Sequence, residues 1–553
     1  MTTPGTSTKT HTPATPDAPE APAGLLAAIH AYETALLAND LDALDAAFVD
    51  SPGTMRGDDR GLLVGHDAIS AFRGARGGVA TRSLTHVEVR PLTEDRALVV
   101  SVSRFAAGGQ GLQTQLWRRD GEGDTDTDPG AGAGPRWRIE AAHVTGRPKA
   151  VDTTVWRAVG DPLVAPTAVG PLDGLTIAVK DLYAVPGQPV GAGNPTYLHE
   201  APVETTAAPA VAALLAAGAS IRGIARTDEF AYNLTGRNAH HGTPPNSAAP
   251  TRLPGGSSSG SASAVGLGMV EIGIGTDTAG SVRVPASYQG LWGLRTTHGT
   301  VSRDGLLPLA PSFDTVGWLT RSPEVLLAAL DATVPPMPGP DEAVDATVLV
   351  VPEELVALVE PDTARAFTAF VETLDEPVAT VRLRDLGMPE PRALQEQLRL
   401  VQAAEALAAH GPWIDAHPGA LSAVVGDRFR AAGANDPDAT ADAVTALDAV
   451  RTTIRGALAG RTLLFPTVPG PAPLLDADAR ALERTRTATT AMTALASVGG
   501  LPAVSAPAMT VAGAPVGVCL VGGPDTDRAL VIRAGRMLPD QPAPGLPTVS
   551  VVR

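Results

Sequence analysis

The chain has 553 residues, of which 44% are hydrophobic, 18% are charged and 4% are aromatic. Because a single core stops growing at roughly 250–300 residues, this length predicts two or more domains. The formal charge of −17 repels phosphate backbones and anionic lipids, so we expect a small-molecule substrate and neither a nucleic-acid nor a membrane partner.

Cysteine content and the N-terminal residues bear on the compartment. Cys519 is the single cysteine, which excludes a disulfide framework within the chain and a zinc site built on several thiolates. The first residues lack the apolar core of a signal peptide, and no run approaches the roughly 20 apolar residues of a membrane helix. These features favour a cytoplasmic protein.

The chain begins with a segment unlike the rest. Residues 1–22 are rich in Thr, Pro and Ala and contain almost no large apolar side chain. Such a segment cannot bury enough surface to offset the entropy lost on ordering, so we predict a disordered tail. Residues 25–37 and 41–49 then have the apolar spacing of two helices, and Asp40 is a suitable cap for the second.

Four strand-like segments follow these helices, and Gly- and Asp-rich turns separate them. The segments are THVEVRPL, RALVVSVSRF, LQTQLWRR and RWRIEAAHV. Helices followed by an antiparallel meander predict an α+β domain over residues 23–149.

Residues 150–553 show the alternation of strands and helices that is typical of an α/β fold. GLTIAVKDLY is predicted to be a buried strand, and AAPAVAALLAAGASIRGIA a helix that leads into another strand. The stretch from about 324 to 460 is Ala-rich and is predicted to be mostly helical. Strand-like apolar runs return after it.

The most informative segment is PGGSSSGSASAVGLGMVEIGIGTDTAGSVRVPAS, residues 254–287. A Gly/Ser run by itself is equally typical of a flexible linker. Here it leads into an apolar segment and a second turn of small residues, GTDTAGS, where a ligand can approach the backbone closely. A Walker phosphate loop is excluded because the Gly-Lys-Ser/Thr ending is absent.

Over residues 160–535 the sequence resembles the amidase signature hydrolases. The resemblance rests on GLTIAVKDL around Lys180, on the paired-serine loop at 255–260, and on GTDTAGSVRVPAS around Ser281. Ser281 follows Ser257 by 24 residues, and Lys180 precedes Ser257 by 77, as in the family pattern. The resemblance implies an α/β/α sandwich with a central mixed sheet.

The resemblance also implies catalytic roles. Ser281 would be the nucleophile, Ser257 a bridging serine on a cis peptide, and Lys180 the general base. A serine hydroxyl is a weak nucleophile until a base removes its proton, and Ser–Lys arrangements are known variants of triad chemistry. Lys180 must then be neutral at rest, which requires burial to lower its pKa by about three units.

The turn before Ser281 is predicted to stabilise the oxyanion. The backbone N–H groups of Thr278, Ala279, Gly280 and Ser281 would form the oxyanion hole. The resemblance implies that three polar neighbours support this geometry: Ser258, Asp277 and Arg283. For the last two, a purely structural ion pair is an equally good interpretation.

Residues 23–149 resemble the cone-shaped NTF2-like domains, and within them a subgroup related to the small ureide hydrolase of cyanuric acid catabolism. The matching segments are AYETALLANDLDALDAAF, GTMR, GHDAISAFR and WRIEAAHV. The resemblance implies a pocket with Tyr32 and Arg56, whose guanidinium could hold a carboxylate through two hydrogen bonds. The loop after Arg56 departs from the subgroup, so a structural or dimerising role is the alternative. No histidine spacing here is typical of a metal site.

Together these features predict an amidase that hydrolyses a linear C–N bond of a small amide or ureide, with no metal or organic cofactor, in a chain that could dimerise. Two substrate classes stay open. The first domain favours a carboxylated ureide of the biuret or allophanate type, whereas AAPTRLPGG and SFDTVGW resemble plant-type aryl-acetamide hydrolases. Arg237 and Asn238 are candidates for substrate contact.

Two other interpretations belong to different functional classes. The chain could be a noncatalytic scaffold or receptor of this fold, although the presence of Lys180, Ser257 and Ser281 argues against it. It could also be the ammonia-releasing subunit of a tRNA-dependent amidotransferase, which would require partner subunits that the first domain does not suggest.

Overall fold

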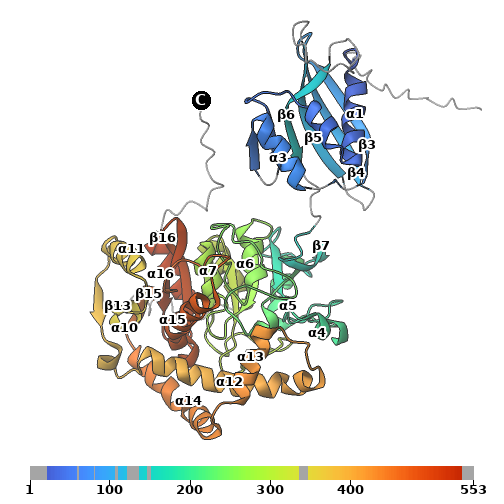
Figure 1. Ribbon diagram of the computed structural model, residues 1–553. Coiled ribbons are helices and arrows are strands. Elements are labelled where there is room, and N and C mark those ends of the chain that lie inside the picture. Colours follow the sequence, from blue (N-terminus) through green and yellow to red (C-terminus); the bar gives the residue numbers. More distant parts are fainter. Residues whose placement is uncertain are drawn as a thin grey trace, which may run out of the picture. The chain divides into compact units, whose positions relative to one another are not determined.

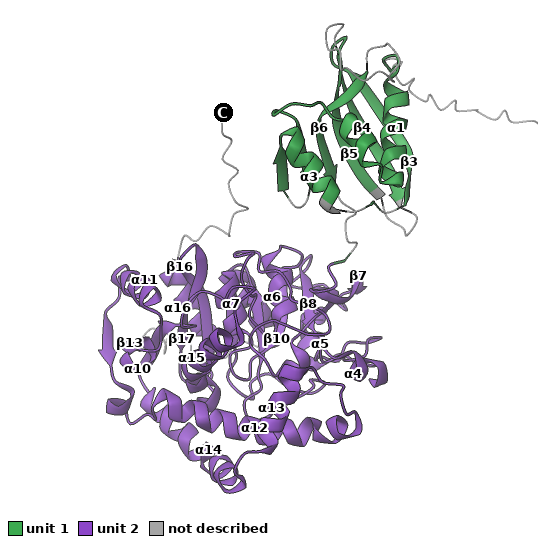
Figure 2. Cartoon of the chain, viewed as in Figure 1, with its two compact units in different colours: residues 1–151 green, residues 152–553 purple. Residues whose placement is uncertain are grey.

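The computed structural model divides into two compact units, residues 1–151 and 152–553 (Figures 1 and 2). Each unit has its own hydrophobic core. The predicted tail, except for its last two residues, lies outside the part of the chain that the structure describes. The described residues are 21–58, 61–76, 78–79, 81–105, 110–120, 136–145, 151–334 and 347–538.

The first unit is an α+β domain in which helices pack on a six-stranded sheet of order β2-β1-β6-β5-β4-β3. Strands β3 to β6 form the predicted antiparallel meander, and β1 pairs with β6 in parallel. The Asp40 side chain caps α2 as predicted, because it accepts a hydrogen bond from the N–H of Ala43 at 3.1 Å. The elements are α1 (Leu25–Ala38), α2 (Leu41–Ala46), β1 (Met55–Asp58), β2 (Gly61–Val64), α3 (His66–Arg76), β3 (Arg82–Pro91), β4 (Arg96–Phe105), β5 (Gln110–Arg119) and β6 (Trp137–Thr145).

The second unit is built on an eleven-stranded sheet of order β14-β13-β15-β17-β16-β11-β12-β10-β8-β9-β7. The sheet is mixed: β8 lies parallel to β9 and β10, whereas β11, β12, β16 and β17 form antiparallel pairs. Its strands are β7 (Trp156–Val164), β8 (Thr176–Lys180), β9 (Ser220–Ala225), β10 (Ile272–Thr276), β11 (Trp292–Arg295), β12 (Val316–Thr320), β13 (Val348–Pro352), β14 (Val378–Val381), β15 (Arg461–Pro466), β16 (Ala503–Val511) and β17 (Ala514–Val521).

Helices cover both faces of this sheet. Successive residues of a strand point to opposite faces, and Leu349 and Val351 pack in one core while Val350 packs in another. Helices α5, α8, α11 and α16 contribute to the first core, and α10, α12, α14 and α15 to the second. The predicted α/β/α sandwich with a mixed sheet is therefore confirmed.

The helices of the second unit range from single turns to long helices that contribute to the active site. They are α4 (Pro195–Glu200), α5 (Pro209–Ala216), α6 (Ser259–Gly266), α7 (Arg283–Gln289), α8 (Pro323–Thr333), α10 (Glu353–Val356), α11 (Pro361–Glu372), α12 (Pro391–Ala416), α13 (Ala423–Gly433), α14 (Pro437–Ala457), α15 (Ala479–Gly499) and α16 (Asp527–Met537), with the 3-10 helices η1 (Glu229–Ala231) and η2 (Leu383–Leu386).

The segment predicted to be mostly helical, about 324–460, also contains two strands. β13 pairs in parallel with β15, and β14 pairs in parallel with β13, so they extend the sheet at one edge. The apolar run of β13 is short, and periodicity alone cannot separate such a run from a buried helix.

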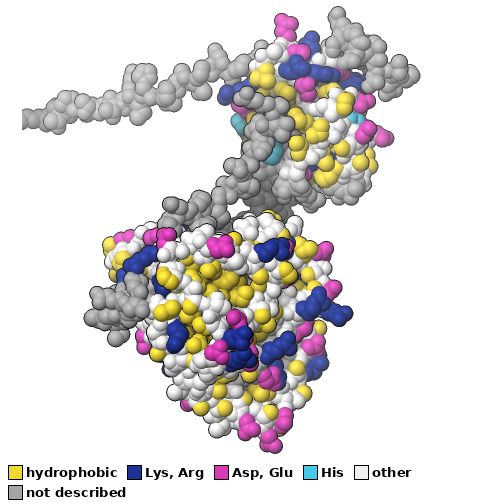
Figure 3. Space-filling model, turned by 90° about the vertical axis from the view of Figure 1, so that its left-hand side faces the viewer, with side chains coloured by type: hydrophobic (Ala, Val, Ile, Leu, Met, Phe, Trp, Pro, Cys, Tyr) yellow, Lys and Arg dark blue, Asp and Glu magenta, His cyan; other side chains and the backbone are white. Residues whose placement is uncertain are grey.

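The surface of the second unit carries charges of both signs. On the face shown in Figure 3, basic and acidic side chains are intermixed, with apolar side chains between them. Among the described residues, no helix combines the length and apolar character needed to cross a membrane.

Candidate active site

Lys180 lies at the end of β8, in the interior of the second unit. Ile177, Ala178 and Val179 precede it on the strand, and all four residues are completely buried. Burial lowers the pKa of Lys180 to about 7, against the opposing charges of Asp228, Asp314 and Asp277. The neutral amine that a general base requires is therefore accessible near neutral pH.

Three hydroxyl groups surround the Lys180 amine. Its Nζ atom lies 2.8 Å from Ser257 Oγ, 3.0 Å from Ser258 Oγ and 2.7 Å from Thr276 Oγ1. Ser258 Oγ donates to the Thr276 carbonyl oxygen at 3.3 Å, so it accepts from the lysine. A neutral amine has two N–H groups and one lone pair, so it can also receive a proton from Ser257 or Thr276.

The Ser257 loop is fixed by its backbone. The Gly256–Ser257 peptide bond is cis, as the resemblance implies. The Ser257 carbonyl oxygen accepts hydrogen bonds from the Asp228 N–H at 3.2 Å and from Thr227 Oγ1 at 2.9 Å. A Cβ atom at Gly256 would lie 2.5 Å from Asp228 Oδ2, so a larger residue would displace this loop.

Ser281 lies in the turn that joins β10 to α7. Its carbonyl oxygen accepts from the Ser258 N–H at 3.2 Å, which ties the turn to the paired-serine loop. The residue is 2% exposed and lines a pocket of about 140 Å³. The fold thus brings the two serine motifs together beside Lys180, with Ser281 at the pocket.

The turn before Ser281 offers backbone donors. The Gly280 N–H donates to Asp277 Oδ1 at 2.9 Å, so it is occupied within the turn. No hydrogen bond among the described residues uses the N–H of Thr278, Ala279 or Ser281. The predicted set of oxyanion donors therefore narrows to these three.

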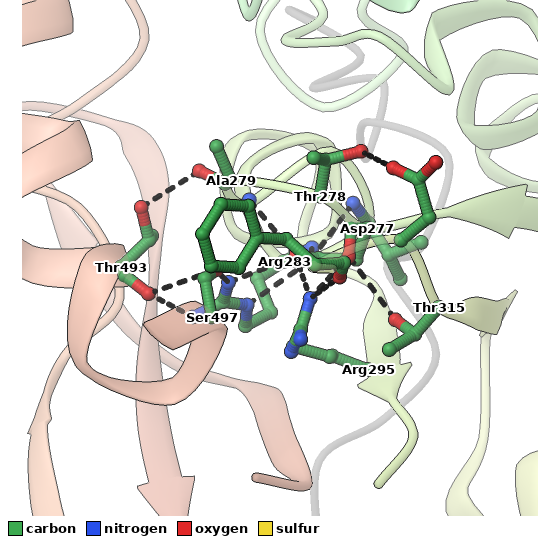
Figure 4. A network of polar contacts seen from close by, with 12 residues as sticks. Asp277, Thr278, Ala279, Arg283, Arg295, Thr315, Thr493 and Ser497 are labelled. Carbon is green, nitrogen blue, oxygen red and sulfur yellow. Dashed lines mark hydrogen bonds and ion pairs between the residues drawn. The ribbon is translucent and has the colours of Figure 1, made fainter. Parts of the chain in front are cut away.

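Asp277 anchors this turn through two buried arginines (Figure 4). Arg283 donates to Asp277 from Nε at 3.0 Å and from Nη2 at 2.8 Å, and Arg295 Nη1 lies 3.3 Å from Asp277 Oδ1. Burial alone would raise the pKa of Asp277, but the Arg283 and Arg295 charges hold it well below its usual range. Arg283 also bonds Thr493 and Ser497 of α15, so the cluster joins the turn to that helix.

We expect Asp277→Asn to destabilise the protein by about 3–5 kcal/mol, because it leaves buried guanidinium groups without their counter-charge. The urea midpoint at neutral pH measures the loss. The exposed pair of Asp362 and Arg365 supplies the control, since Asp362→Asn should cost no more than about 0.5 kcal/mol. Equal midpoints for the two variants would contradict a structural role for Asp277.

Arg237 and Asn238 line a second pocket, of about 440 Å³, and not the pocket of Ser281. The Asn238 amide donates to the carbonyl oxygens of Gly193 at 2.7 Å and Thr227 at 3.0 Å, and its oxygen accepts from the His240 N–H. Asn238 thus makes structural hydrogen bonds, and substrate contact by either residue stays a prediction.

In the first unit, Tyr32 and Arg56 are buried. Tyr32 packs against the rings of Phe48 and Trp117. Arg56 pairs with Asp58 at 2.7 Å, and Asp58 belongs to the GDDR loop that departs from the family pattern. The Asp58 carboxylate thus neutralises the guanidinium that was predicted to bind a substrate carboxylate. Among the described residues, no group of three or more His, Cys, Asp or Glu side chains is arranged to hold a metal ion.

Several residues of this site were not among those predicted from the sequence. Thr276, which contacts the lysine, is part of the GTDTAGS motif, so its position in the motif was a usable signal. Arg399, Arg428 and Arg486 line the Ser281 pocket from α12, α13 and α15. No motif marks them, because they lie on helices whose packing the sequence does not specify.

Comparison with known families agrees with this geometry. The Amidase family model matches residues 161–531, and an AtzH-like model matches residues 15–148. The chain belongs to the amidase family. The predicted enzyme class, an amidase, is thereby confirmed. The AtzH-like match also confirms the predicted resemblance of the N-terminal domain to the subgroup related to the small ureide hydrolase.

Individual relatives align with this amidase over different lengths. Amidase 1 of Arabidopsis thaliana is 36% identical over 393 residues, which cover 65% of this chain and 91% of the relative. The 2-amino-5-chloromuconic acid deaminase of Comamonas testosteroni is 48% identical over 177 residues, 31% of this chain and 38% of the relative. A solved structure of a vestigial protein complex, related to the origins of an s-triazine catabolic enzyme, has 28% identity and a TM-score of 0.61, and covers 68% of this chain and 85% of that one.

Proposed function

We propose that this amidase cleaves the C–N bond of a small linear amide or ureide through an acyl-enzyme on Ser281, with Ser257 and Lys180 as a proton relay. The observation that carries the proposal is the buried Lys180 amine, 2.8 Å from Ser257 Oγ, in a unit where Ser281 lines a pocket.

In the acylation step, Ser281 Oγ attacks the carbonyl carbon of the substrate. Its proton passes to Ser257 Oγ as the Ser257 proton passes to the lone pair of Lys180. The carbonyl oxygen becomes an oxyanion in the tetrahedral intermediate. The N–H groups of Thr278, Ala279 and Ser281 are the proposed donors to it, and one such donor is typically worth about 3 kcal/mol.

The same relay then runs in reverse. As the C–N bond breaks, Ser257 gives a proton to the leaving nitrogen and regains one from Lys180, so ammonia or an amine departs neutral. Water next attacks the acyl-enzyme, and its proton follows the same route to the lysine. Collapse of the second intermediate returns the proton to Ser281 and releases the acid.

A hydrolysis screen tests this proposal. Ammonia release is measured from biuret, allophanate, indole-3-acetamide and simple aliphatic amides, with the purified full-length chain and no added metal. We expect ammonia release from at least one of these compounds, in an amount that matches the carboxylic or carbamic acid formed. Absence of hydrolysis across the whole set would favour a noncatalytic scaffold.

We propose a structural or dimerising role for the N-terminal domain, because Asp58 neutralises Arg56 and Tyr32 packs in the core of that domain. Its core is separate from those of the catalytic unit. We therefore expect deletion of residues 1–149 to leave kcat within about threefold of the intact chain, because Lys180, Ser257 and Ser281 all belong to the second unit.

Sedimentation of both forms measures whether the deletion also removes a dimer. The Arg56→Ala variant of the full-length chain is the matched control, and it should retain full activity. Loss of hydrolysis in both the deletion and Arg56→Ala would instead indicate that the N-terminal pocket takes part in the reaction.

A further inference from the structure

The Ser281 pocket is strongly basic. Arg399, Arg428 and Arg486 contribute to its wall, from three different helices. None of the described residues that line it is an Asp or a Glu. A small pocket with several cations and no carboxylate attracts an anionic group and repels an ammonium group.

Two of the three arginines have a carboxylate partner on their own helix. Arg399 donates to Glu396 at 2.7 Å, and Arg486 donates to Glu483 from Nε at 2.8 Å. Both glutamates are exposed and lie outside the wall of the Ser281 pocket, although Glu483 lines the adjoining pocket of about 440 Å³. These two cations are therefore already partly neutralised.

Arg428 differs from them. Its guanidinium donates to the Tyr232 carbonyl oxygen and, at 3.0 Å, to Asn233 Oδ1. Both acceptors are neutral, and no ion pair of Arg428 occurs among the described residues. Burial, with the nearby Arg486 charge, lowers the pKa of Arg428 to about 10, so it stays charged at neutral pH. Arg428 is half-buried, and the charges of Glu483 and Asp228 reach it without forming an ion pair. A bound anion in direct contact would therefore stabilise its charge further.

Arg428 also stands at a junction between two cavities. Arg428, Arg486 and Asn233 line both the Ser281 pocket and the adjoining pocket of about 440 Å³. A ligand that extends from Ser281 toward the second pocket meets this guanidinium. Arginine is well suited to such a site, because its planar fork binds a carboxylate through two parallel hydrogen bonds.

We propose that the substrate carries a carboxylate at the end remote from the scissile C–N bond, and that Arg428 binds this carboxylate. Arg399 and Arg486 add to the positive field around it. The inference rests on the proposed amide hydrolysis and selects between the two substrate classes, favouring a carboxylated amide or ureide over a neutral aryl acetamide. Amides that bear an ammonium group are rejected.

Matched substrate pairs test this inference. Allophanate is compared with biuret, and succinamate with 4-methylpentanamide, because each pair keeps the amide and the overall shape but only the first member carries a carboxylate. We expect the anionic member to have the higher kcat/KM. Arg428→Gln should lower kcat/KM for the anionic member by about 10-fold to 100-fold, mainly through KM, since hydrogen bonds to charged groups are of this strength. For the neutral member the change should stay within about threefold.

Two further variants serve as controls. Arg430 is an exposed arginine on the same helix, paired with Asp427 and absent from the pocket wall. Arg430→Gln should therefore leave kcat/KM unchanged for both members of each pair. Arg428→Lys keeps the charge and should recover part of the loss. A wild-type enzyme that prefers the neutral members, or an Arg428→Gln variant that slows both members equally, would overturn the inference while leaving amide hydrolysis intact. Failure to hydrolyse any amide would instead overturn the proposed function.

Discussion

Ser281→Ala is expected to abolish hydrolysis while leaving the fold unchanged. Removing the nucleophile of a serine hydrolase lowers kcat by a factor on the order of 10⁶, because no other group can form the acyl-enzyme. The substitution deletes one oxygen from a buried residue, so stability should change little. Ammonia release under saturating substrate measures the loss, and circular dichroism verifies the fold.

Ser263 provides the matched control for this variant. It lies on α6, six residues after Ser257, and its buried hydroxyl has no hydrogen-bond partner among the described residues. Ser263→Ala should therefore retain activity close to that of the wild type. Hydrolysis by Ser281→Ala at a comparable rate would remove Ser281 from the mechanism.

Lys180→Met is expected to be nearly as damaging, because it removes the base that accepts the serine proton. Methionine has a similar length and suits a buried position.

With the pKa of Lys180 at about 7, kcat/KM of the wild type should rise as pH increases through this value and become level above it, since only the neutral amine accepts a proton. A pH profile from 5 to 9 measures this limb. Any residual activity of Lys180→Met should not show this rise of kcat/KM with pH.

Stability gives an independent measure of the same pKa. The pKa of Lys180 is lower when folded, about 7, than the value of about 10.4 in an unfolded chain. Between these values the unfolded chain binds more protons, so the contribution of Lys180 to stability rises with pH. Lys180→Met should remove this rise. A variant with wild-type rates, or with an unchanged rising limb, would contradict the assignment of Lys180 as the base.

Much of the architecture could be predicted from periodicity. The meander of the first unit alternates apolar and polar residues clearly, and β8 is a short apolar run before Lys180. β13 and β14 were not predicted within the segment expected to be helical, because a four- or five-residue strand has too little periodic pattern to be distinguished from a buried helix. Their assignment depends on pairing: β13 pairs with β15, which is distant in sequence, and β14 pairs with β13.

The candidate site could be predicted only in part. The resemblance to the amidase signature hydrolases, carried by motif spacing and order, predicted Lys180, Ser257 and Ser281, since motif residues near a strand end or turn keep a fixed geometry. The Gly280 N–H donates to Asp277 because of the backbone orientation of the turn. Arg428 reaches the pocket because of the way its helix packs. Neither property follows from residue type, so the proposal of a carboxylated substrate depends on the three-dimensional structure.

Direct observation of the acyl-enzyme tests the central claim most sharply. The wild-type enzyme is quenched with acid during turnover of p-nitrophenyl acetate, digested, and its peptides are sequenced by mass spectrometry. We predict an acetyl group on Ser281 that forms with the initial burst of nitrophenol and is absent from Ser281→Ala. A burst whose acetyl group is carried by any other residue, Ser257 included, would contradict the account.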